Sequence, residues 1–538
     1  HIYDLVEICA QKGIKKSILC PGSRCAPLLI GFGKHSKIKT FSVTDERSAG
    51  FVGLGLAQQS GEPVVLVCTS GTAALNFAPA VTEAFYQNVP LIVMTADRPS
   101  EWIDQWDGQT IHQEHMYEPH VKGSFVFDIE NQSVTEEALN LAMTEAYGPV
   151  HLNIPIQEPF YPDGLDDVKF ATEAQRTQRK IVKKKIDNEI WQELQSELNN
   201  TEKIMILGGQ SEPNLELNEY LNQIDIPIVG DIISNLHPIK NVTKSADLVF
   251  KTDDKHLQPD LLITFGRSVI SKNLKLYLRK FKPKMHWHIG LGMVGNPFQS
   301  LTKTIRVNPK YFFQEWLKRE ITFQNQDKYR STLSEAQTKV DSELRSKLSD
   351  SDFNSFSAVW KVMEAMPNNS VLHLGNSMPV RIANFIGIKN HNVDVWSNRG
   401  TSGIDGTVST AVGHALADPK RTHTLIAGDL SLFYDRNGLW LNHEFPKNLR
   451  IVVLNDGGGG IFNMIPGPSN LGRLTELFTT PHNRTAELTA KEFGLDYRST
   501  SSVEALKASL KGFEGGILEI FTNMETNTKF LKLLKIGE

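Results

Sequence analysis

Short apolar runs alternate with amphipathic stretches along the chain, and they fall into three blocks. The first block contains, in order, SILCPGSR (17–24), GFVGLGLAQQ (50–59), PVVLVCTSGTAALN (63–76) and VPLIVMTADRP (89–99). Apolar strand runs that alternate with helical segments are typical of a parallel sheet wrapped by helices. We therefore predict an α/β domain whose ligands lie at the C-terminal ends of its strands.

Two further blocks repeat this pattern. Their strand runs are IMILGG (204–209), IPIVGD (226–231), LLITFG (261–266), HWHIG (286–290), VLHLGNS (371–377), THTLIAGD (422–429), LRIVVLND (449–456) and GGILEIFT (515–522). The polar, basic stretch 171–185 reads as a solvated linker rather than a nucleic-acid patch, because no aromatic residues interleave it. A second polar stretch, 323–352, is strongly helical. The prediction is an α/β protein of three consecutive domains with mainly parallel sheets, at residues 1–175, 186–335 and 350–538.

Two acidic residues mark the ends of neighbouring strand runs in the third block. Asp429 ends TLIAGD and Asp456 ends LRIVVLND, 27 residues later. A βαβ crossover takes about 30 residues and brings both strand ends to one edge of the sheet. Because Mg²⁺ is typically held by one or two carboxylates together with phosphate oxygens, this edge predicts a metal-bound diphosphate. The alternative is two unrelated turns, in which Asp and Gly are common for backbone reasons.

The composition is that of an ordinary globular protein. The formal net charge is −4, from 57 basic and 61 acidic residues, so no overall field favours nucleic acid or anionic lipid. No apolar run approaches the ~20 residues needed to insert into a membrane. Four cysteines, all within the first 68 positions, form no CxxC pair, which favours reduced thiols. The chain opens without a leader and without an initiator Met, so we expect missing N-terminal residues and a cytoplasmic location.

The Gly428-Asp429 pair and Asp456 resemble the signature of thiamine-diphosphate-dependent enzymes, whose second ligand belongs to an Asn-Asn pair. The resemblance implies a thiamine-diphosphate-binding fold with Mg²⁺ as the ion and Mn²⁺ as an alternative. Asp429, Asp456 and the Gly458 carbonyl would be its ligands, although Asp at 456 adds a negative charge. Gly428 would contact the cofactor, and Ser431, opening the next helix, would lend backbone N–H groups to the diphosphate.

The segment TDERSAGFVGLGLA (44–57) carries the candidate catalytic acid. In this superfamily a glutamate beside N1′ of the aminopyrimidine stands just before an apolar, glycine-containing helix, and Glu46 occupies that position. Burial would hold its pKa high enough to share a proton with the ring. Asp45-Glu46 could instead be an ordinary helix start, with acids near the positive end of the dipole.

Eight segments together are more specific. They are PGSRCAP (21–27), DERSAGF (45–51), TSGTA (69–73), ADRP (96–99), GNSMPVR (375–381), SNRGTSGIDG (397–406), GDLSLFYDRNGL (428–439) and GGIFNMIP (459–466). In this order they resemble the 2-succinyl-5-enolpyruvyl-6-hydroxy-3-cyclohexene-1-carboxylate synthases of menaquinone biosynthesis. That family decarboxylates 2-oxoglutarate and adds the resulting carbanion equivalent to isochorismate. The resemblance covers essentially the whole chain.

This resemblance implies a set of site residues. The substrate pocket would comprise Ser23, Arg24, Arg98, Gln109, Lys272, Ser377, Arg381 and Arg399, with Gln109 also assisting proton transfer. Both substrates are dicarboxylates, and arginine grips a carboxylate with two parallel hydrogen bonds, so four arginines in these loops fit the task. Lys272 is the weakest match, since the family often has a second basic residue where this chain has Asn273. The apolar cofactor contacts would be Ile404, Ile461, Phe462 and Ile465.

Partners and rival functions follow from the same resemblance. The superfamily builds its active sites between subunits, so we expect a homodimer or a dimer of dimers. The nearest rival is another thiamine-diphosphate-dependent decarboxylase or carboligase, although the chain lacks the His-His pair frequent in such decarboxylases. A non-enzyme alternative is a dinucleotide- or flavin-binding protein built on the middle block. His286 and His288 more plausibly share one strand face than bind a metal.

Overall fold

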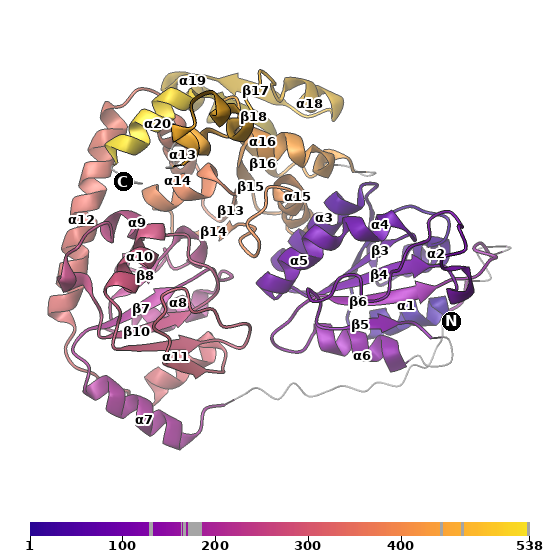
Figure 1. Ribbon diagram of the computed structural model, residues 1–538, viewed down its shortest axis with the longest axis horizontal. Helices are drawn as coiled ribbons and strands as arrows, with labels where there is room; N and C mark the ends of the chain where they lie inside the picture. The colour runs from indigo at the N-terminus through magenta and orange to yellow at the C-terminus, as the bar shows by residue number, and fades with distance from the viewer. Residues whose placement is uncertain are drawn as a thin grey trace. The chain divides into compact units, whose positions relative to one another are not determined.

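Three parallel six-stranded sheets, connected by helices, make up the protein in the computed structural model (Figure 1). The structure describes residues 1–128, 133–162, 164, 168–170, 185–441, 445–463 and 467–534. The predicted α/β class is therefore confirmed. The predicted linker falls, except for Lys185, outside the described residues.

The first sheet has the strand order β2-β1-β3-β4-β6-β5. Its strands are β1 (Lys16–Leu19), β2 (Lys39–Ser42), β3 (Val64–Cys68), β4 (Leu91–Asp97), β5 (Ser124–Val126) and β6 (Val150–Pro155). The helices of this part are α1 (Ile2–Gln11), α2 (Ala26–Lys34), α3 (Glu46–Ser60), α4 (Thr72–Asn76), α5 (Ala78–Gln87) and α6 (Ser133–Ala142). Strands β3 and β4 are buried along their whole length, which explains why their sequences are continuously apolar.

The third sheet has the order β14-β13-β15-β16-β18-β17, which repeats the order of the first sheet strand for strand. Its strands are β13 (Ser370–Leu374), β14 (Val393–Trp396), β15 (His423–Gly428), β16 (Leu449–Asn455), β17 (Tyr497–Thr500) and β18 (Gly516–Phe521). Its helices are α13 (Ser355–Glu364), α14 (Met378–Ile386), α15 (Thr407–Ala417), α16 (Asp429–Tyr434), α17 (Glu476–Thr479), α18 (Glu487–Glu492), α19 (Val503–Leu510) and α20 (Met524–Leu533). Because β15 and β16 are neighbours, their C-terminal ends meet at one edge, as predicted.

The central sheet has a different order, β12-β11-β10-β7-β8-β9. Strands are added from β7 toward β9 on one side and from β10 toward β12 on the other, and all are parallel. Its strands are β7 (Ile204–Gly208), β8 (Ile228–Gly230), β9 (Val242–Thr243), β10 (Leu261–Phe265), β11 (Met285–Ile289) and β12 (Lys303–Ile305). Its helices are α7 (Asn188–Asn199), α8 (Leu215–Asn222), α9 (Ala246–Val249), α10 (Lys272–Lys280) and α11 (Pro309–Lys318), followed by the long α12 (Asp327–Asp350). This is the strand order of dinucleotide-binding domains.

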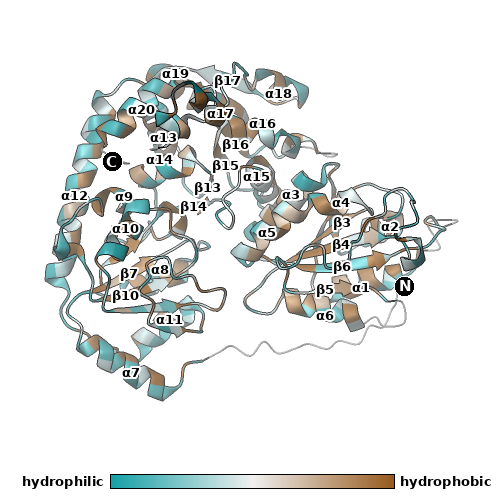
Figure 2. Cartoon of the chain, viewed as in Figure 1, coloured by the Kyte–Doolittle hydropathy of each residue, from teal (hydrophilic) through white to brown (hydrophobic). Residues whose placement is uncertain are grey.

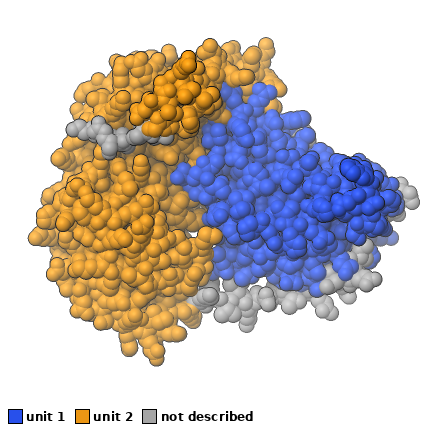
Figure 3. Space-filling model, in the orientation of Figure 1, with its two compact units in different colours: residues 1–181, 398–423, 431–449 blue, residues 182–397, 424–430, 450–538 orange. Residues whose placement is uncertain are grey.

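The chain forms two compact units that do not follow the order of the sequence (Figure 3). Unit 1 comprises residues 1–181, 398–423 and 431–449, and unit 2 comprises residues 182–397, 424–430 and 450–538. Unit 1 is completed by α15, which packs on α3 at two glycines. A Cβ on Gly55 would lie 2.1 Å from the Thr410 carbonyl oxygen, and a Cβ on Gly413 would lie 2.1 Å from that of Val52. Close backbone approach therefore requires glycine at both positions.

Apolar residues concentrate on the strands, whereas the long α12 is largely polar (Figure 2). The core of unit 2 contains large fully buried side chains such as Trp287, Phe312 and Phe356. A search of the described residues finds no helix long and apolar enough to cross a membrane.

Candidate functional site

The clearest site lies where β15 and β16 of the third sheet end. Asp429 is buried, and its carboxylate accepts hydrogen bonds from the backbone N–H groups of Leu430 (2.6 Å), Gly457 (3.1 Å) and Gly458 (3.0 Å). The loop after β16 is thus folded back onto the acid that follows β15. This contact places Asp456, which opens that loop, beside Asp429.

The two carboxylates interact electrostatically. Burial, followed by the negative charge of Asp429, raises the pKa of Asp456 to about 7. Burial also raises the pKa of Asp429, while His482, whose Nε2 lies 3.4 Å from the carboxylate, lowers it. Two adjacent buried acids whose ionisation is opposed in this way are suited to binding a divalent cation.

The donor set fits Mg²⁺ better than a transition metal. No group of three or more His, Cys, Asp or Glu side chains in the described part of the chain could hold a metal. Mg²⁺ needs fewer protein ligands, since it retains waters and binds phosphate oxygens. The carboxylates of Asp429 and Asp456 are of the donor type that such an ion uses.

The glycine run after Asp456 is required by the protein's own packing. A Cβ on Gly458 would lie 2.4 Å from the Thr479 carbonyl oxygen, and one on Gly460 would lie 2.4 Å from Oδ2 of Asp456. Ile461 and Phe462 follow in a short 3₁₀ helix (Gly460–Asn463), and the Phe462 ring lies 5.7 Å from that of Phe478. The predicted apolar contact Ile465 lies outside the described residues.

The position predicted for Ser431 needs a correction. Helix α16 begins at Asp429, so Ser431 is its third residue rather than the residue that opens it. The carbonyl of Ser431 accepts from the N–H of Asp435 at 3.1 Å. Gly428 is the last residue of β15, and an added Cβ there would meet no atom within 4 Å.

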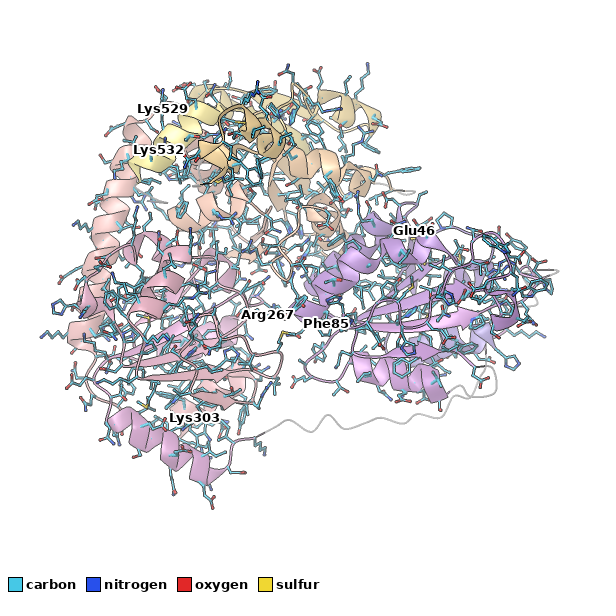
Figure 4. The ribbon with its side chains drawn as sticks, viewed as in Figure 1. Glu46, Phe85, Arg267, Lys303, Lys529 and Lys532 are labelled. Atoms are coloured by element: carbon cyan, nitrogen blue, oxygen red, sulfur yellow. The ribbon has the colours of Figure 1, made fainter. Side chains whose placement is uncertain are left out.

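Glu46 is the first residue of α3 (Figure 4). Asp45 caps the helix by accepting from the backbone N–H groups of Arg47 (2.9 Å) and Ser48 (3.2 Å). Burial raises the pKa of Glu46, and the charge of Asp45 adds to this effect. The glutamate therefore has both the local context and the direction of pKa shift expected for an acid that exchanges a proton with a ring nitrogen.

Four of the predicted pocket residues gather at the strand ends of the first sheet. Arg24 is 8% exposed, donates to the Ile156 carbonyl at 2.7 Å, and has its pKa lowered by burial and by the charge of Arg98. Arg98 donates to the Gly108 carbonyl, next to Gln109, and pairs with Asp107 at 2.9 Å. Ser23 directly precedes Arg24 and is exposed, as is Gln109.

The loop 397–406 carries Arg399 and Ile404, and most of it belongs to unit 1. Glu83 on α5 accepts from the backbone N–H groups of Gly400 (2.8 Å) and Thr401 (2.6 Å). Gly406 packs so closely on Phe51 of α3 that an added Cβ would lie 2.1 Å from the ring. The loop is thereby fixed to the helix that begins with Glu46.

In unit 2, Ser377 and Arg381, both predicted pocket residues, lie in contact after β13. The guanidinium Nη1 of Arg381 donates to the carbonyl of Ser377 at 2.6 Å, and burial lowers the pKa of Arg381. Ser377 itself has φ of 71° and lies just before α14, so the two residues do not share a helical face. The spacing of four residues would suggest a shared helical face, but Ser377 precedes the helix and turns the chain into it. Lys272 is exposed as the first residue of α10.

The sequence analysis did not identify two buried acids, Asp231 and Asp247, that hold the start of α10 and part of α14 in place. Asp231 and Asp247 both accept hydrogen bonds from the residues around Lys272, and Asp231 also accepts from Asn384 of α14. One signal was available, since Asp231 directly follows the run IPIVG and so stands at the end of a strand.

The dinucleotide-binding alternative finds little support in the central sheet. The turn after β7 uses its N–H groups internally: Gly209 donates to Phe265, Gln210 to Ser268 and Ser211 to Ile233. Those groups would have to bind the pyrophosphate of a dinucleotide. His286 and His288 lie on one face of β11, where Nε2 of His286 and Nδ1 of His288 are 2.9 and 3.0 Å from the Thr264 hydroxyl. The shared contact with the Thr264 hydroxyl explains why these two histidines lie together.

Sequence comparisons point to one family along nearly the whole chain. Residues 3–117 match the family model described as "Thiamine pyrophosphate enzyme, N-terminal TPP binding domain". The 2-succinyl-5-enolpyruvyl-6-hydroxy-3-cyclohexene-1-carboxylate synthase of Cytophaga hutchinsonii is 42% identical, over 99% of this chain and 98% of its own. The proteins of the same name from Flavobacterium johnsoniae and Bacteroides fragilis are 38% and 34% identical, over 98% and 99% of this chain and 97% and 98% of their own.

Proposed function

The chain belongs to the 2-succinyl-5-enolpyruvyl-6-hydroxy-3-cyclohexene-1-carboxylate synthase family of thiamine-diphosphate-dependent enzymes, and from this premise we propose that it joins 2-oxoglutarate to isochorismate. In this reaction of menaquinone biosynthesis, the bond between C1 and C2 of 2-oxoglutarate breaks and CO₂ leaves. A new carbon–carbon bond forms between C2 and the β-carbon of the unsaturated acid of isochorismate. When bound, thiamine diphosphate would take up the electron pair left at C2 when CO₂ departs and make it available for the new carbon–carbon bond.

The acidic edge of the third sheet would hold the cofactor's diphosphate through a metal ion. Asp429, Asp456 and the Gly458 carbonyl would bind Mg²⁺, or Mn²⁺ in its place, while Gly428 and Ser431 would contact the diphosphate. The paired buried acids on neighbouring strand ends are the observation that carries this assignment. Without a cation, two such charges would oppose each other at a buried site.

Glu46 would exchange a proton with N1′ of the aminopyrimidine. Its raised pKa fits this task, because a carboxyl that shares a proton must hold it near neutral pH. Ile404, Ile461, Phe462 and Ile465 would provide the apolar contacts to the cofactor. Gln109 would orient a water or hydroxyl for proton transfer.

The substrates bring four carboxylates, and the cationic residues would bind them. Arg24, Arg98 and Arg399 belong to unit 1, and Lys272 and Arg381 to unit 2. Ser23 and Ser377 would add hydroxyl donors beside the arginines. Bidentate guanidinium–carboxylate pairs supply both orientation and charge neutralisation at such a site.

The test is an assay that follows 2-oxoglutarate and isochorismate together. We expect both to be consumed in equal amounts, with one CO₂ released for each pair, when thiamine diphosphate and Mg²⁺ are present. Removal of the metal with a chelator should stop the reaction, and added Mg²⁺ or Mn²⁺ should restore it. Loss of 2-oxoglutarate alone, with isochorismate untouched, would instead identify a decarboxylase.

We also propose that the active assembly is a homodimer or a dimer of dimers, with active sites at the subunit interface. The proposal rests on the superfamily to which the chain belongs. Mixing an inactive Glu46→Gln chain with an inactive Asp429→Ala chain tests it. Recovery of activity in the mixture would support sites shared between subunits, and its absence after verified subunit exchange would contradict them.

A further inference from the structure

Asp231 forms a buried junction between two elements that carry candidate substrate residues. It follows β8 and is 3% exposed. Oδ2 accepts from the backbone N–H groups of Ile270 and Ser271, the latter at 3.1 Å. Oδ1 accepts from the Ser271 hydroxyl and from Nδ2 of Asn384, the latter at 3.1 Å. Four donors on one buried carboxylate make this contact well defined.

The donors close a ring of hydrogen bonds. Nδ2 of Asn384 also lies 3.1 Å from the Ser271 hydroxyl, and its Oδ1 accepts from the backbone N–H of Ile232 at 2.8 Å. Asn384 therefore contacts Asp231, Ser271 and Ile232, the residue that follows Asp231. We call Asp231, Ser271 and Asn384 the buried clamp.

The clamp lies next to two cationic side chains. Ser271 directly precedes Lys272 at the start of α10, and Asn384 stands one helical turn after Arg381 on α14. In a helix, residues three apart share a face, so the position of Asn384 constrains that of Arg381. Both α10 and α14 pack on α9 in unit 2 (Figure 1).

A second acid reinforces the same geometry from α9. Asp247 accepts from the backbone N–H of Asn273 at 2.7 Å, and the Asn273 side chain donates to the Asp247 carbonyl at 3.0 Å. The charge of Asp247 also acts on Arg381. Asn273, where the family often has a second basic residue, therefore serves to anchor the start of α10.

We propose that the buried clamp is a positioning device, which fixes the separation of Lys272 and Arg381 so that they bind the two carboxylates of one isochorismate molecule. The inference rests on the proposed function and deepens it. Asp231, Ser271 and Asn384 act through the two cations and need not touch the substrate. A dicarboxylate with a fixed distance between its charges is bound well only by cations held at a matching distance.

The experiment measures Asn384→Ala against a matched control. Gln326→Ala also removes a buried amide that makes three hydrogen bonds, to Ile204, Glu202 and Gln324, and Gln326 is 1% exposed against 2% for Asn384. We expect Asn384→Ala to raise the KM for isochorismate about 10-fold, with single-turnover CO₂ release from 2-oxoglutarate within about 2-fold of wild type. Gln326→Ala should leave both values near wild type at a comparable loss in Tm.

A double-mutant cycle separates positioning from general weakening. If the clamp acts by setting the distance between two cations, Asn384→Ala should have little further effect on the isochorismate KM once Lys272→Ala is present. Full additivity of the two substitutions would overturn the inference. Equal loss in CO₂ release, or equal KM changes in Asn384→Ala and Gln326→Ala, would overturn it as well.

A second pair of variants covers a folding failure of Asn384→Ala, and the wild-type assay tests the proposed function separately. If Asn384→Ala does not fold, Ser271→Ala removes a single hydroxyl and should raise the isochorismate KM about 3-fold, whereas Ser271→Thr, which keeps the hydroxyl, should restore it. An unchanged KM in a folded Ser271→Ala enzyme would then overturn the inference. A wild-type enzyme that does not consume isochorismate would contradict the proposed function itself, before any variant is compared.

Discussion

The first and third sheets share one strand order but present different side chains at equivalent strand ends. Thr69 and Arg98 follow β3 and β4 of the first sheet, whereas Asp429 and Asp456 follow the equivalent strands β15 and β16 of the third sheet. Topology thus determines where side chains gather, and residue type determines what they can bind. The first edge suits carboxylates, and the third suits a cation.

Acids occur at both edges, but their surroundings differ. Asp97 ends β4 and is satisfied within the protein, because it accepts from Nδ2 of Asn153 at 2.7 Å and from its neighbour's N–H at 2.7 Å. Asp456 instead faces the charge of Asp429. Asp456 also accepts from Nδ2 of Asn527 at 3.1 Å, so what distinguishes it from Asp97 is the second carboxylate at the neighbouring strand end.

The largest effect is expected for Asp429→Ala. A diphosphate without its cation would face the carboxylate of Asp456, so affinity for thiamine diphosphate in the presence of Mg²⁺ should fall by about 10²-fold or more. Titration calorimetry measures it. A strand-end variant in the first sheet, Asp97→Ala, should keep the metal dependence of cofactor binding. Unchanged affinity in Asp429→Ala would remove the metal assignment.

Glu46→Gln should leave the fold intact and reduce turnover by at least about 10²-fold, the usual scale for losing a proton-transfer group. Glu62→Gln, just beyond the other end of α3, is the control and should keep activity near wild type. Circular dichroism and turnover number together provide the measurement. Near-normal activity in Glu46→Gln would be incompatible with the role assigned to it.

Much of this arrangement followed from sequence because it depends on local order. The strand runs 204–209, 261–266 and 449–456 each contain an observed strand, β7, β10 and β16. Since consecutive parallel strands end at one edge, the meeting of Asp429 and Asp456 was also predictable.

Other features depend on contacts between distant segments, which no local pattern encodes. Asp231 meets Asn384 across 153 positions, and Glu83 meets Thr401 across 318. The packing of α15 on α3 requires glycine at both Gly55 and Gly413, but either glycine alone reads as an ordinary helix residue. The equal strand order of the first and third sheets likewise requires pairing information.

Arg381→Ala tests whether the cation after β13 serves the acceptor. We expect kcat/KM for isochorismate to fall by about 10²-fold, the loss of a charge-assisted contact worth about 3 kcal/mol. Single-turnover CO₂ release without isochorismate should survive, since that step precedes the arrival of the acceptor. Equal loss in both measurements would mean that Arg381 serves 2-oxoglutarate or the cofactor.

A smaller effect is expected for Asp456→Asn, which gives the third sheet the amide that the superfamily signature has. Removing one of two adjacent charges should weaken Mg²⁺ affinity by about 10-fold, with turnover near wild type at saturating metal. Activity measured against Mg²⁺ concentration gives the value. Asp394→Asn, on β14 of the same sheet, is the control. Tighter Mg²⁺ binding in Asp456→Asn would show that the second carboxylate opposes metal binding and is not a ligand.

The smallest effect concerns Asp435, a buried acid of unit 1 that resembles Asp97 in being satisfied by its own protein. It accepts from the backbone N–H and the hydroxyl of Ser409, both at 2.7 Å, at the start of α15. Burial nevertheless raises its pKa from 3.8 to about 7, although the charge of Arg47 opposes this. A raised carboxyl pKa means that the folded state binds the proton more tightly than the unfolded state. The favourable contribution is therefore present below about pH 4 and is lost as pH rises toward 7.

Asp435→Asn removes this pH dependence, because an amide mimics the protonated acid at every pH. The Tm of the variant relative to wild type should accordingly rise between pH 5 and pH 8, by about 2–4 °C for a change of about 1 kcal/mol. Thermal unfolding at both pH values, in buffers of equal ionic strength, measures the difference. A relative Tm that falls over this range would show that Ser409 and Arg47 stabilise the ionised carboxylate. Asp435 would then be ionised in the folded state, as the carboxylates of a cation site are. Only the proximity of Asp429 to Asp456 would distinguish that pair from the buried acids of unit 1.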